Sequence, residues 1–456
     1  MTLSLHEIDR CFQRVLPGVI ATCDRGGIPN INYITQIQVI DDRYIALSYQ
    51  FPTKTRLNLE QNPHATLEVY DPLTLDAYRL DLRFDRAETS GPLFDQLAWR
   101  IEAIASYTGL AKIFQLRAAY ICEVLAIERR VGFLQAEFAP GSPPTRNEPM
   151  TEMRGLRLVS DRISRARDLD ELLTGTLAAL DEVFGFTHGT ILVPEDAGRL
   201  VTIASHGYGA TSIGAEVRIG EGLIGVVAKN RTLLRVLGLD ANLQYSRQVR
   251  AEFERAGTAT QLVTAEVPLP GLPDARSQMA IPLLVQDRLV GVIALEARDT
   301  ITFSQWHEAF LQVLANQFAS AMENIAERDD EEDDDDAPAA GSSTTVPRPR
   351  AFTYFKNDDC VFVDGEYLIR NVPAKILWKL LRMHQTDNRT EFSNRELRLD
   401  PSLGLPAFKD NLESRLILLR KRLEQKCPEL KLVPTRRGRF ALEVGCPIEL
   451  IERETG

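Results

Sequence analysis

An unbroken acidic run constrains this chain more than any other feature of its sequence. Asp329 to Asp336 reads DDEEDDDD, and the stretch that follows as far as Arg350 is APAAGSSTTVPRPR. A segment of this composition has almost no apolar side chain to bury, and its like charges repel one another. We therefore predict a disordered acidic, Pro-, Ser- and Thr-rich linker at residues 327–350 and an independent domain at residues 351–456.

Prolines mark a second boundary. Residues 137–149 read EFAPGSPPTRNEP, and four prolines with a glycine cannot continue a helix or a central strand. The sequence therefore predicts three folded domains, at residues 1–135, 150–326 and 351–456. A length of 456 residues agrees with three domains of ordinary size. We see no internal repeat.

Composition excludes several protein classes. Hydrophobic residues make up 44% and charged residues 26% of the chain, as in globular proteins. No stretch approaches 18 consecutive apolar residues, so we expect no membrane span. The six cysteines form no CxxC pair, which favours free thiols in the cytoplasm over disulfides or zinc. We find no nucleophile motif, metal-ligand spacing or GxxxxGK loop, so we predict neither catalytic nor metal-binding residues.

The first domain is expected to be a small barrel. Strands are predicted at Val19–Cys23, Ile31–Val39, Tyr44–Tyr49, Ala65–Tyr70 and Leu80–Ala87, with helices at Thr55–Gln61 and Phe94–Tyr107. The segments GIPNINYITQIQVIDDRYIALSYQ and TKTRLNLEQNPHATLEV resemble the pyridoxamine 5'-phosphate oxidase-like split barrel. That family usually binds FMN at a homodimer interface.

The resemblance implies where the flavin phosphate would bind. In that family a Ser or Thr and a Lys just before the short helix hold the phosphate. Here Thr53, Lys54, Thr55 and Arg56 lie in that segment, with Asn58 one turn on, although Lys54 precedes the family's usual lysine position by one residue. A hydroxyl and cations at a helix N-terminus suit an anion. A cofactor-free barrel, or a barrel for another ligand, is the alternative.

The second domain resembles a GAF domain, an α/β sandwich. Helical spacing is predicted over Arg154–Val183, with Asp168 as a cap and Glu171 as its capping-box partner, and over Phe303–Ile325. Strands are expected at Gly189–Val193, Leu200–Ser205, Gln278–Val285 and Leu289–Ala297. The resemblance rests on SHGYG, VRIGEGLIGVVAKNRTLLRV and MAIPLLVQDRLVGVIALEA.

The ligand of this second domain is left open. No cysteine lies between residues 123 and 359, which excludes a thioether-linked bilin, and there is no NKFDE-like string. His188, His206 and His307 are the domain's only histidines, so one of them is a weak candidate to ligate haem. Arg218 and the amides near Gly222 are weak candidates for an anion at a helix start. A tight turn with no ligand is the alternative, and the terminal helices are candidates for pairing in a homodimer.

The third domain resembles the OmpR-type winged helix-turn-helix domain. A hairpin at Cys360–Ile369 and a helix at Pro373–His384 are followed by a strand at Thr390–Phe392, a helix capped by Ser393 and a long helix at Asp410–Lys426. A basic hairpin closes the domain around Arg437 and Gly438. The motifs LRKRLE and VPTRRGRFAL carry the resemblance, which implies double-stranded DNA as the partner.

Charge identifies the DNA-binding candidates. Nine basic residues and three acidic residues lie between Asn411 and Arg439. The resemblance implies base contacts by Ser414 and Arg415, and phosphate or minor-groove contacts by the remaining candidates, which are Arg420, Lys421, Arg422, Arg436, Arg437 and Arg439. Ile417 and Leu418 stand where polar residues are usual, so this face is a candidate either for thymine methyl groups or for a protein partner.

Together these features predict a cytoplasmic, homodimeric, one-component transcription regulator. The barrel and the GAF domain would sense FMN, a redox signal or an unidentified small molecule, and the winged helix would bind DNA. Two alternatives stay open at this stage. One is a flavin-dependent oxidoreductase of the split-barrel type with regulatory C-terminal domains, and the other is a scaffold whose winged helix binds protein.

Overall fold

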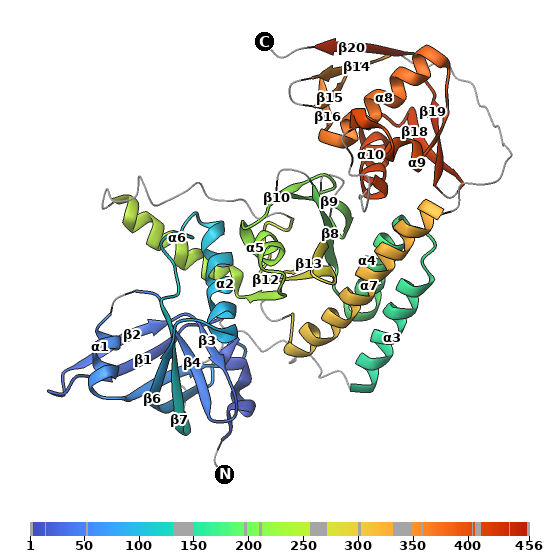
Figure 1. Cartoon of the computed structure of the whole chain (residues 1–456). Coiled ribbons are helices and arrows are strands. Elements are labelled where there is room, and N and C mark those ends of the chain that lie inside the picture. Colours follow the sequence, from blue (N-terminus) through green and yellow to red (C-terminus); the bar gives the residue numbers. More distant parts are fainter. Residues whose placement is uncertain are drawn as a thin grey trace.

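The computed structural model contains three domains in chain order (Figure 1). It describes the whole chain except residues 1–2, 14, 52, 131–148, 196–197, 209–211, 256–270, 300–301, 332–348, 357–358, 404, 406–411, 437 and 454–456. Most of the predicted linker therefore lies outside the described residues. Its first residues continue a helix that ends at Glu331, and the next strand begins at Arg350.

The N-terminal domain is a seven-stranded antiparallel barrel sheet with strand order β2-β1-β5-β6-β7-β4-β3. Its strands are β1 (Gly18–Cys23), β2 (Pro29–Ile34), β3 (Ile37–Val39), β4 (Tyr44–Tyr49), β5 (His64–Tyr70), β6 (Ala77–Glu88) and β7 (Ala118–Arg130). A 3-10 helix, η1 (Leu5–Phe12), and helices α1 (Lys54–Gln61) and α2 (Pro92–Tyr107) complete it. The strand predicted over Ile31–Val39 is divided at Thr35, because β2 pairs with β1 whereas β3 pairs with β4 at the other edge.

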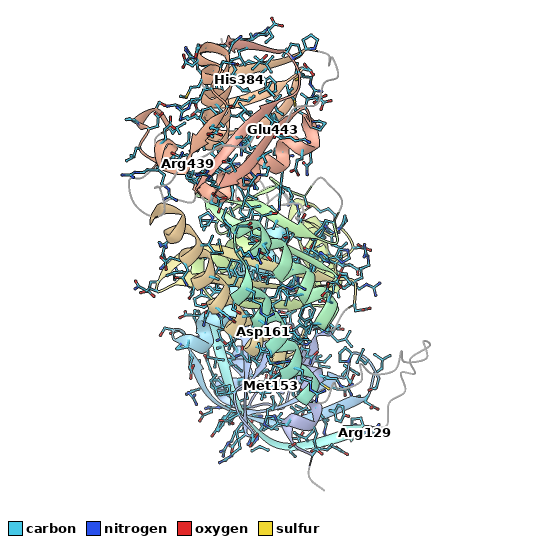
Figure 2. All side chains as sticks on the ribbon, turned by 90° about the vertical axis from the view of Figure 1, so that its right-hand side faces the viewer. Arg129, Met153, Asp161, His384, Arg439 and Glu443 are labelled. Atoms are coloured by element: carbon cyan, nitrogen blue, oxygen red, sulfur yellow. The ribbon has the colours of Figure 1, made fainter. Side chains whose placement is uncertain are left out.

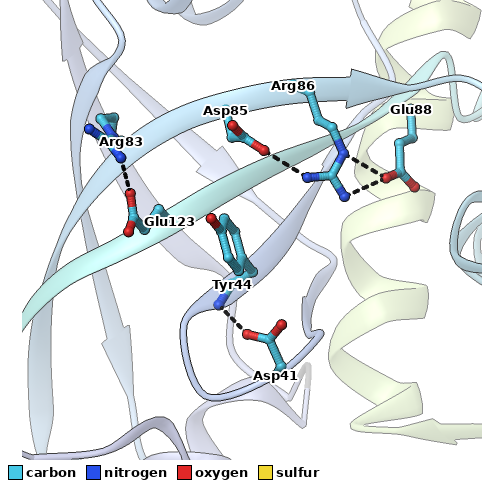
Figure 3. A network of polar contacts seen from close by, with 7 residues as sticks. All are labelled: Asp41, Tyr44, Arg83, Asp85, Arg86, Glu88 and Glu123. Carbon is cyan, nitrogen blue, oxygen red and sulfur yellow. Dashed lines mark hydrogen bonds and ion pairs between the residues drawn. The ribbon is translucent and has the colours of Figure 1, made fainter.

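Ion pairs cover part of the outer surface of this barrel. The Glu123 carboxylate on β7 accepts from the guanidiniums of Arg43 and Arg83. Figure 3 shows the contact with Arg83. Hydrogen bonding from Arg43, and then from Arg83, lowers the pKa of Glu123. On β6, Arg86 joins Asp85 and Glu88. The Arg83–Glu123 pair links β6 to β7, whereas the pairs of Arg86 lie within β6.

The second domain is a six-stranded sheet with helices on both faces. Its strand order is β10-β9-β8-β13-β12-β11. The strands are β8 (His188–Glu195), β9 (Arg199–His206), β10 (Glu216–Arg218), β11 (Leu234–Leu237), β12 (Ser277–Val285) and β13 (Arg288–Ala297). Helices α3 (Pro149–Arg165), α4 (Leu169–Phe184) and α7 (Gln305–Glu331) pack on one face, and α5 (Gly222–Asn230) packs on the other, beside α6 (Leu239–Arg255).

Local signals in this domain behave as the sequence predicts, with one adjustment. The Asp168 carboxylate accepts from the Glu171 amide at 2.8 Å and caps α4. The Glu171 side chain accepts from the amide of Arg167, one residue before the N-cap Asp168 whose amide a capping box would use. The apolar stripes of α4 and α7 pack mainly on their own sheet and that of α3 packs on α4 and α7, leaving Leu158 and Val313 exposed.

The C-terminal domain has two small sheets around three helices. One sheet has the order β16-β15-β14-β20 and the other β17-β19-β18. The elements are β14 (Arg350–Phe355), β15 (Cys360–Val363), β16 (Glu366–Arg370), α8 (Asn371–Asp387), β17 (Glu391–Ser393), α9 (Asn394–Arg398), η3 (Pro401–Leu403), α10 (Leu412–Lys426), β18 (Leu430–Arg436), β19 (Arg439–Val444) and β20 (Ile448–Arg453). The predicted turn at Asp364–Gly365 has positive φ at both residues, and Ser393 caps α9 through the Glu396 amide at 3.2 Å.

The three domains share their hydrophobic cores. One cluster of buried residues runs from the α4 and α7 side of the second domain into the C-terminal domain. Another joins the opposite face of the same sheet to Ala103, Ile104 and Tyr107 of α2. Helix α2 belongs to the first domain in sequence, yet it stands against α5 of the second (Figure 1). The second domain therefore has an interface with each neighbour.

Candidate functional sites

A pocket opens in the first domain between β2, β4 and the start of α1. It holds about 690 Å³, open solvent at its mouth included. Its polar lining comes from Asn32, Thr35, Ser48, Gln50, Thr53, Thr55 and Arg56, and its aromatic lining from Tyr33, Tyr49, Phe51, Phe114, Tyr120 and Tyr245. A pocket that combines flat aromatic surfaces with hydroxyls and one guanidinium suits an aromatic ligand that carries an anionic group.

The cation of this pocket is held beside an aromatic pair. The rings of Tyr49 and Tyr120 stack with centroids 5.2 Å apart. The Arg56 guanidinium lies 5.8 Å from the centroid of the Tyr49 ring and donates to Glu60 at 2.8 Å. Burial raises the pKa of Tyr120 to about 12, and hydrogen bonding to Glu60 raises that of Arg56. The Tyr120 phenol is therefore neutral and the Arg56 guanidinium is charged at physiological pH.

The five residues predicted to bind a cofactor separate into two groups. Thr53, Thr55 and Arg56 line the pocket. Lys54 is exposed and is not part of the lining. Asn58 is buried and donates to Thr22 Oγ1 at 3.1 Å, so it ties α1 to β1. In addition, Thr53 is the N-cap of α1 and its side chain makes no capping hydrogen bond, so its hydroxyl is available to a ligand.

Two lining residues come from parts of the chain that sequence reasoning did not connect with the pocket. Phe114 follows α2, and Tyr245 lies on α6 in the second domain. Their ring centroids are 6.1 Å apart. Both are ordinary aromatic residues in segments without a motif, so no local signal marks them. The second domain thus supplies part of the wall of a pocket in the first.

The weak ligand-binding candidates of the second domain lie apart. Arg218 ends β10 with an exposed side chain, and its guanidinium lies 3.8 Å from the Glu221 carboxylate. Gly222 begins α5 with a φ of +64°, and a Cβ there would meet the Tyr107 ring at 2.9 Å. Its amide donates to Ser106 Oγ at 2.8 Å. The start of α5 is therefore in contact with α2.

A chain of buried hydrogen bonds continues from this contact. The Leu223 amide donates to the Tyr107 hydroxyl at 3.0 Å, and that hydroxyl donates to Gln278 Oε1 at 2.9 Å. Gln278 then donates to Glu296, which also accepts from the Tyr208 hydroxyl at 2.6 Å. Burial raises the pKa of Glu296. The side chains of Tyr107, Gln278, Glu296 and Tyr208 thus form one continuous chain of hydrogen bonds.

The three histidines named as haem candidates have separate structural partners. His188 Nδ1 lies 2.8 Å from the Thr187 hydroxyl, and His206 Nε2 lies 2.8 Å from Asp181. His307 Nδ1 accepts from the Ser304 amide at the start of α7. In the described part of the chain, no three His, Cys, Asp or Glu residues form a group able to hold a metal ion. All six cysteines are free thiols, as predicted.

The predicted base-contacting residues of α10 are buried. Ser414, Arg415, Ile417 and Leu418 are each less than a tenth exposed. The apolar pair is thus part of the core and leaves no apolar recognition surface on this helix. Arg420 donates to the carbonyl of Leu432 at 2.9 Å, which holds α10 against β18.

The next two candidates contact the second domain. Lys421 Nζ lies 3.1 Å from Asp170 and 3.4 Å from the carbonyl oxygen of Ile203. The Arg422 guanidinium lies against Gly214, where an added Cβ would come within 2.7 Å of it. Nearby, Arg370 donates to Glu216 at 2.7 Å. Lys421 on α10 is therefore directed at a carboxylate of α4 and a carbonyl oxygen of β9 in the second domain.

The β18–β19 hairpin presents the remaining basic candidates. Arg436 and Arg439 are exposed near the turn, and Arg437 lies outside the described residues. In Figure 2, Arg439 lies at the edge of the C-terminal domain nearer the second domain, whereas His384 lies toward the far side. The two described arginines project from the end of a rigid hairpin.

Two family models match the chain. The pyridoxamine 5'-phosphate oxidase model covers residues 4–122, and the GAF domain model covers residues 166–323. Neither model reaches the C-terminal domain. A search of curated protein sequences finds no match. Among the part of the chain that the structure describes, no helix is long and apolar enough to cross a membrane.

Several solved structures are similar to parts of this chain. A GAF domain of a phosphoenolpyruvate-protein phosphotransferase from Coxiella burnetii is 20% identical with a TM-score of 0.31, over 39% of this chain and 96% of that one. An FMN-binding protein from Syntrophomonas wolfei is 19% identical with a TM-score of 0.24, over 28% and 89%. Free methionine-R-sulfoxide reductase from Neisseria meningitidis is 17% identical with a TM-score of 0.31, over 40% and 95%.

The matched residues coincide with the first two folded domains. Residues 4–122 contain every barrel strand up to the first half of β7, and residues 166–323 contain the complete six-stranded sheet. The chain therefore combines a pyridoxamine 5'-phosphate oxidase-like split barrel with a GAF domain, and this combination is that of a sensory or regulatory protein.

Proposed function

We propose that this chain is a ligand-responsive transcription regulator. The barrel pocket takes an aromatic, phosphate-bearing ligand, for which FMN is the candidate, and the C-terminal domain binds double-stranded DNA. The observation that carries the proposal is the pocket itself, where Arg56, Thr53 and Thr55 lie beside the stacked rings of Tyr49 and Tyr120.

The residues of the pocket fit FMN. Arg56 with the hydroxyls of Thr53 and Thr55 would hold the phosphate at the start of α1, where the first amides of the helix also favour an anion. The tyrosine rings offer a stacking surface for the isoalloxazine ring. Bound flavin supplies one- and two-electron redox chemistry, so the protein would report a redox state or the supply of the cofactor.

Two neighbouring cationic residues allow specific binding of FMN to be distinguished from non-specific electrostatic attraction. Arg56 lines the pocket, whereas Lys54 is exposed two residues earlier and does not. A charge-assisted hydrogen bond contributes about 1.5–3 kcal/mol. Arg56→Ala should therefore weaken FMN binding by about 10- to 100-fold, while Lys54→Ala should change it by less than about 3-fold. Absorbance and fluorescence titration of the full chain measure both values. Equal losses, or an absence of FMN binding, would contradict the proposal.

The DNA-binding half of the proposal is supported by charge on projecting elements. Arg436 and Arg439 are exposed on the β18–β19 hairpin, whereas Lys421 and Arg422 on α10 lie against the GAF domain. Each phosphate contact contributes about one unit to the slope of log affinity against log salt. Arg436→Ala with Arg439→Ala should lower the affinity for duplex DNA and reduce that slope by about two units in fluorescence anisotropy. An unchanged slope would instead favour the alternative in which the C-terminal domain binds protein.

A homodimer through the barrel completes the proposal. Ile31 is 70% and Tyr33 is 66% exposed on the edge strand β2, close to exposed Ile28 and Leu57. Contiguous exposed apolar side chains on a sheet edge favour contact with another chain. Tyr33 also lines the pocket, so a second copy at β2 would cover its mouth. Ile31→Asp should shift the mass measured by light scattering from dimer to monomer, whereas a monomeric parent chain would contradict this step.

A further inference from the structure

The first backbone amides of α5 have no hydrogen-bond acceptor from the side chain of their own N-cap residue. The N-cap residue Glu221 makes no side-chain capping hydrogen bond, so the first amides of α5 have to be satisfied from elsewhere. Two hydroxyls from outside the GAF domain do this. Ser106 Oγ accepts from the Gly222 amide, and the Tyr107 hydroxyl accepts from the Leu223 amide. The helix start therefore behaves as a binding site that is filled.

The rest of that site is built from GAF residues. Gln278 on β12 and Glu296 on β13 are 2% and 3% exposed, deep in the sheet. The Tyr107 phenol reaches Gln278, and Gln278 reaches Glu296. Buried polar side chains are costly unless each has a partner, and here the partner that completes the set comes from another domain.

The phenol is also enclosed sterically. Tyr107 is 1% exposed, and it lies in a core cluster with Leu223, Val226 and Ala280. Helix α6 closes over the end of α2, since Arg250 donates to the Thr108 carbonyl at 2.8 Å. We infer that the GAF domain has a binding site for a hydroxyl-bearing aromatic ring, made by the start of α5, Gln278 and Glu296, and that Tyr107 occupies it as a tethered ligand.

This assignment gives the GAF domain a defined role in the chain. Its site is filled by the barrel, so it binds the helix that leads from the barrel and not a free small molecule. Phe114, seven residues after Tyr107, lines the barrel pocket beside Tyr245. A short segment thus has one end in the GAF site and the other in the pocket. The inference about the GAF site holds whatever the barrel and the C-terminal domain bind.

Chemical rescue tests the site in the full chain. Tyr107→Ala removes the ring and its hydroxyl and leaves a cavity open to a small ligand, as buried ring deletions do elsewhere. Phenol should bind this variant saturably and raise its melting temperature, and it should bind at least about 10-fold more tightly than benzene, because only phenol can satisfy Gln278 and Leu223. The parent chain should show no saturable response to phenol.

The outcomes are distinct. Equal binding of phenol and benzene would mean that the space is merely apolar, and no saturable binding would mean that it is no ligand site; either result overturns the inference. Tyr107→Phe covers the case in which the alanine variant does not fold. Hydrogen exchange at the Leu223 amide should then rise by about 10-fold. Tyr354→Phe is the matched control, because it removes a phenol that donates to Asp359 at 2.7 Å in the C-terminal domain. Equal exchange at Leu223 in the two variants would also overturn it.

Discussion

The GAF domain meets its two neighbours through interfaces of different chemistry. Toward the barrel, the contact is made by a ring that is 1% exposed and by hydrogen bonds between uncharged groups at Ser106, Tyr107 and Gln278. Toward the C-terminal domain, a shared cluster of buried apolar side chains is joined by ion pairs that water reaches. In the Lys421–Asp170 pair the two side chains are 16% and 45% exposed.

This difference predicts that the contact between the barrel and the GAF domain is permanent and that the contact between the GAF domain and the C-terminal domain is reversible. Neutral buried hydrogen bonds are insensitive to salt, whereas partly exposed ion pairs are screened by it. DNA phosphates also compete for the same cations, since Lys421 and Arg422 are both candidates for phosphate contacts and both lie against the GAF domain. The barrel and the GAF domain should therefore move as one body, while the C-terminal domain should be able to separate from them.

The largest effect is expected at the barrel interface. Tyr107→Ala deletes a fully buried aromatic ring and leaves Gln278 and the Leu223 amide without a partner. Deletions of this kind cost about 3–5 kcal/mol. We expect the denaturation midpoint of the barrel–GAF part to fall accordingly in urea, followed by tryptophan fluorescence, with the C-terminal domain unchanged. A shift of the urea midpoint no greater than that of a surface substitution would contradict the prediction that the barrel and the GAF domain move as one body.

The second prediction concerns the reversible interface. Asp170→Asn with Glu216→Gln removes the carboxylates that hold Lys421 and Arg370. Each partly exposed pair contributes about 0.2–1 kcal/mol, so the two together should raise DNA affinity by up to about 30-fold at low salt. Fluorescence anisotropy with duplex DNA measures this change.

A matched control for that experiment is an ion pair within the GAF domain. Asp274→Asn removes the partner of Arg298, a pair at 2.8 Å whose two side chains are more than half exposed. It should leave DNA affinity unchanged. If the double variant also leaves affinity unchanged, or lowers it, the contact between α10 and the GAF domain does not restrain DNA binding.

Much of the fold follows from local sequence signals. The turn at Asp364–Gly365, the caps at Asp168 and Ser393, and the strand Tyr44–Tyr49 were all predictable, because each depends on neighbouring residues. Strand β7 was missed because its first six residues are all buried, which hides the alternation of a half-exposed strand. Helix α6 was missed because its sequence is mostly polar and has no cap motif.

The candidate sites were predictable only in part, for a related reason. Thr53, Thr55 and Arg56 lie in a run of hydroxyls and cations before a helix, a pattern visible in the sequence. Tyr107 and Tyr245 gain their roles from contacts across a domain boundary, and no spacing within the chain encodes such contacts. The burial of Ser414 and Arg415 likewise depends on how α10 packs, which charge counting does not address.

A third prediction uses pH to act on the GAF domain through His307 at the start of α7. Burial, and then the nearby charge of Arg235, lowers the pKa of His307 to about 4. Its folded form is neutral, while the unfolded form binds a proton near pH 6.5. Its contribution to stability is therefore complete above pH 6.5 and is lost as the pH falls toward 4. Partial exposure reduces the expected loss between pH 7 and pH 5 to about 1 kcal/mol.

The substitution His307→Asn isolates that contribution. Asparagine keeps an oxygen able to accept from the Ser304 amide but does not titrate. The variant should lose less stability than the parent chain between pH 7 and pH 5 in urea titrations. The pKa of Arg370 is raised by Glu216, so that guanidinium stays charged over the same range and the C-terminal interface should not report the change. Identical pH dependence in the two chains would show that His307 is not the responsible group.

The smallest effect is expected at an ion pair on the rim of the barrel interface. Lys229 on α5 lies 2.8 Å from Glu102 on α2, and the two side chains are 52% and 30% exposed. Such a pair contributes about 0–1 kcal/mol. Lys229→Ala should therefore shift the urea midpoint by less than about a third of the shift in Tyr107→Ala, and 0.5 M salt should not separate the barrel from the GAF domain in hydrogen exchange. If Lys229→Ala were as damaging as the loss of the phenol, charge and not the buried hydroxyl chain would hold this interface, and the two sides of the GAF domain would not differ in kind.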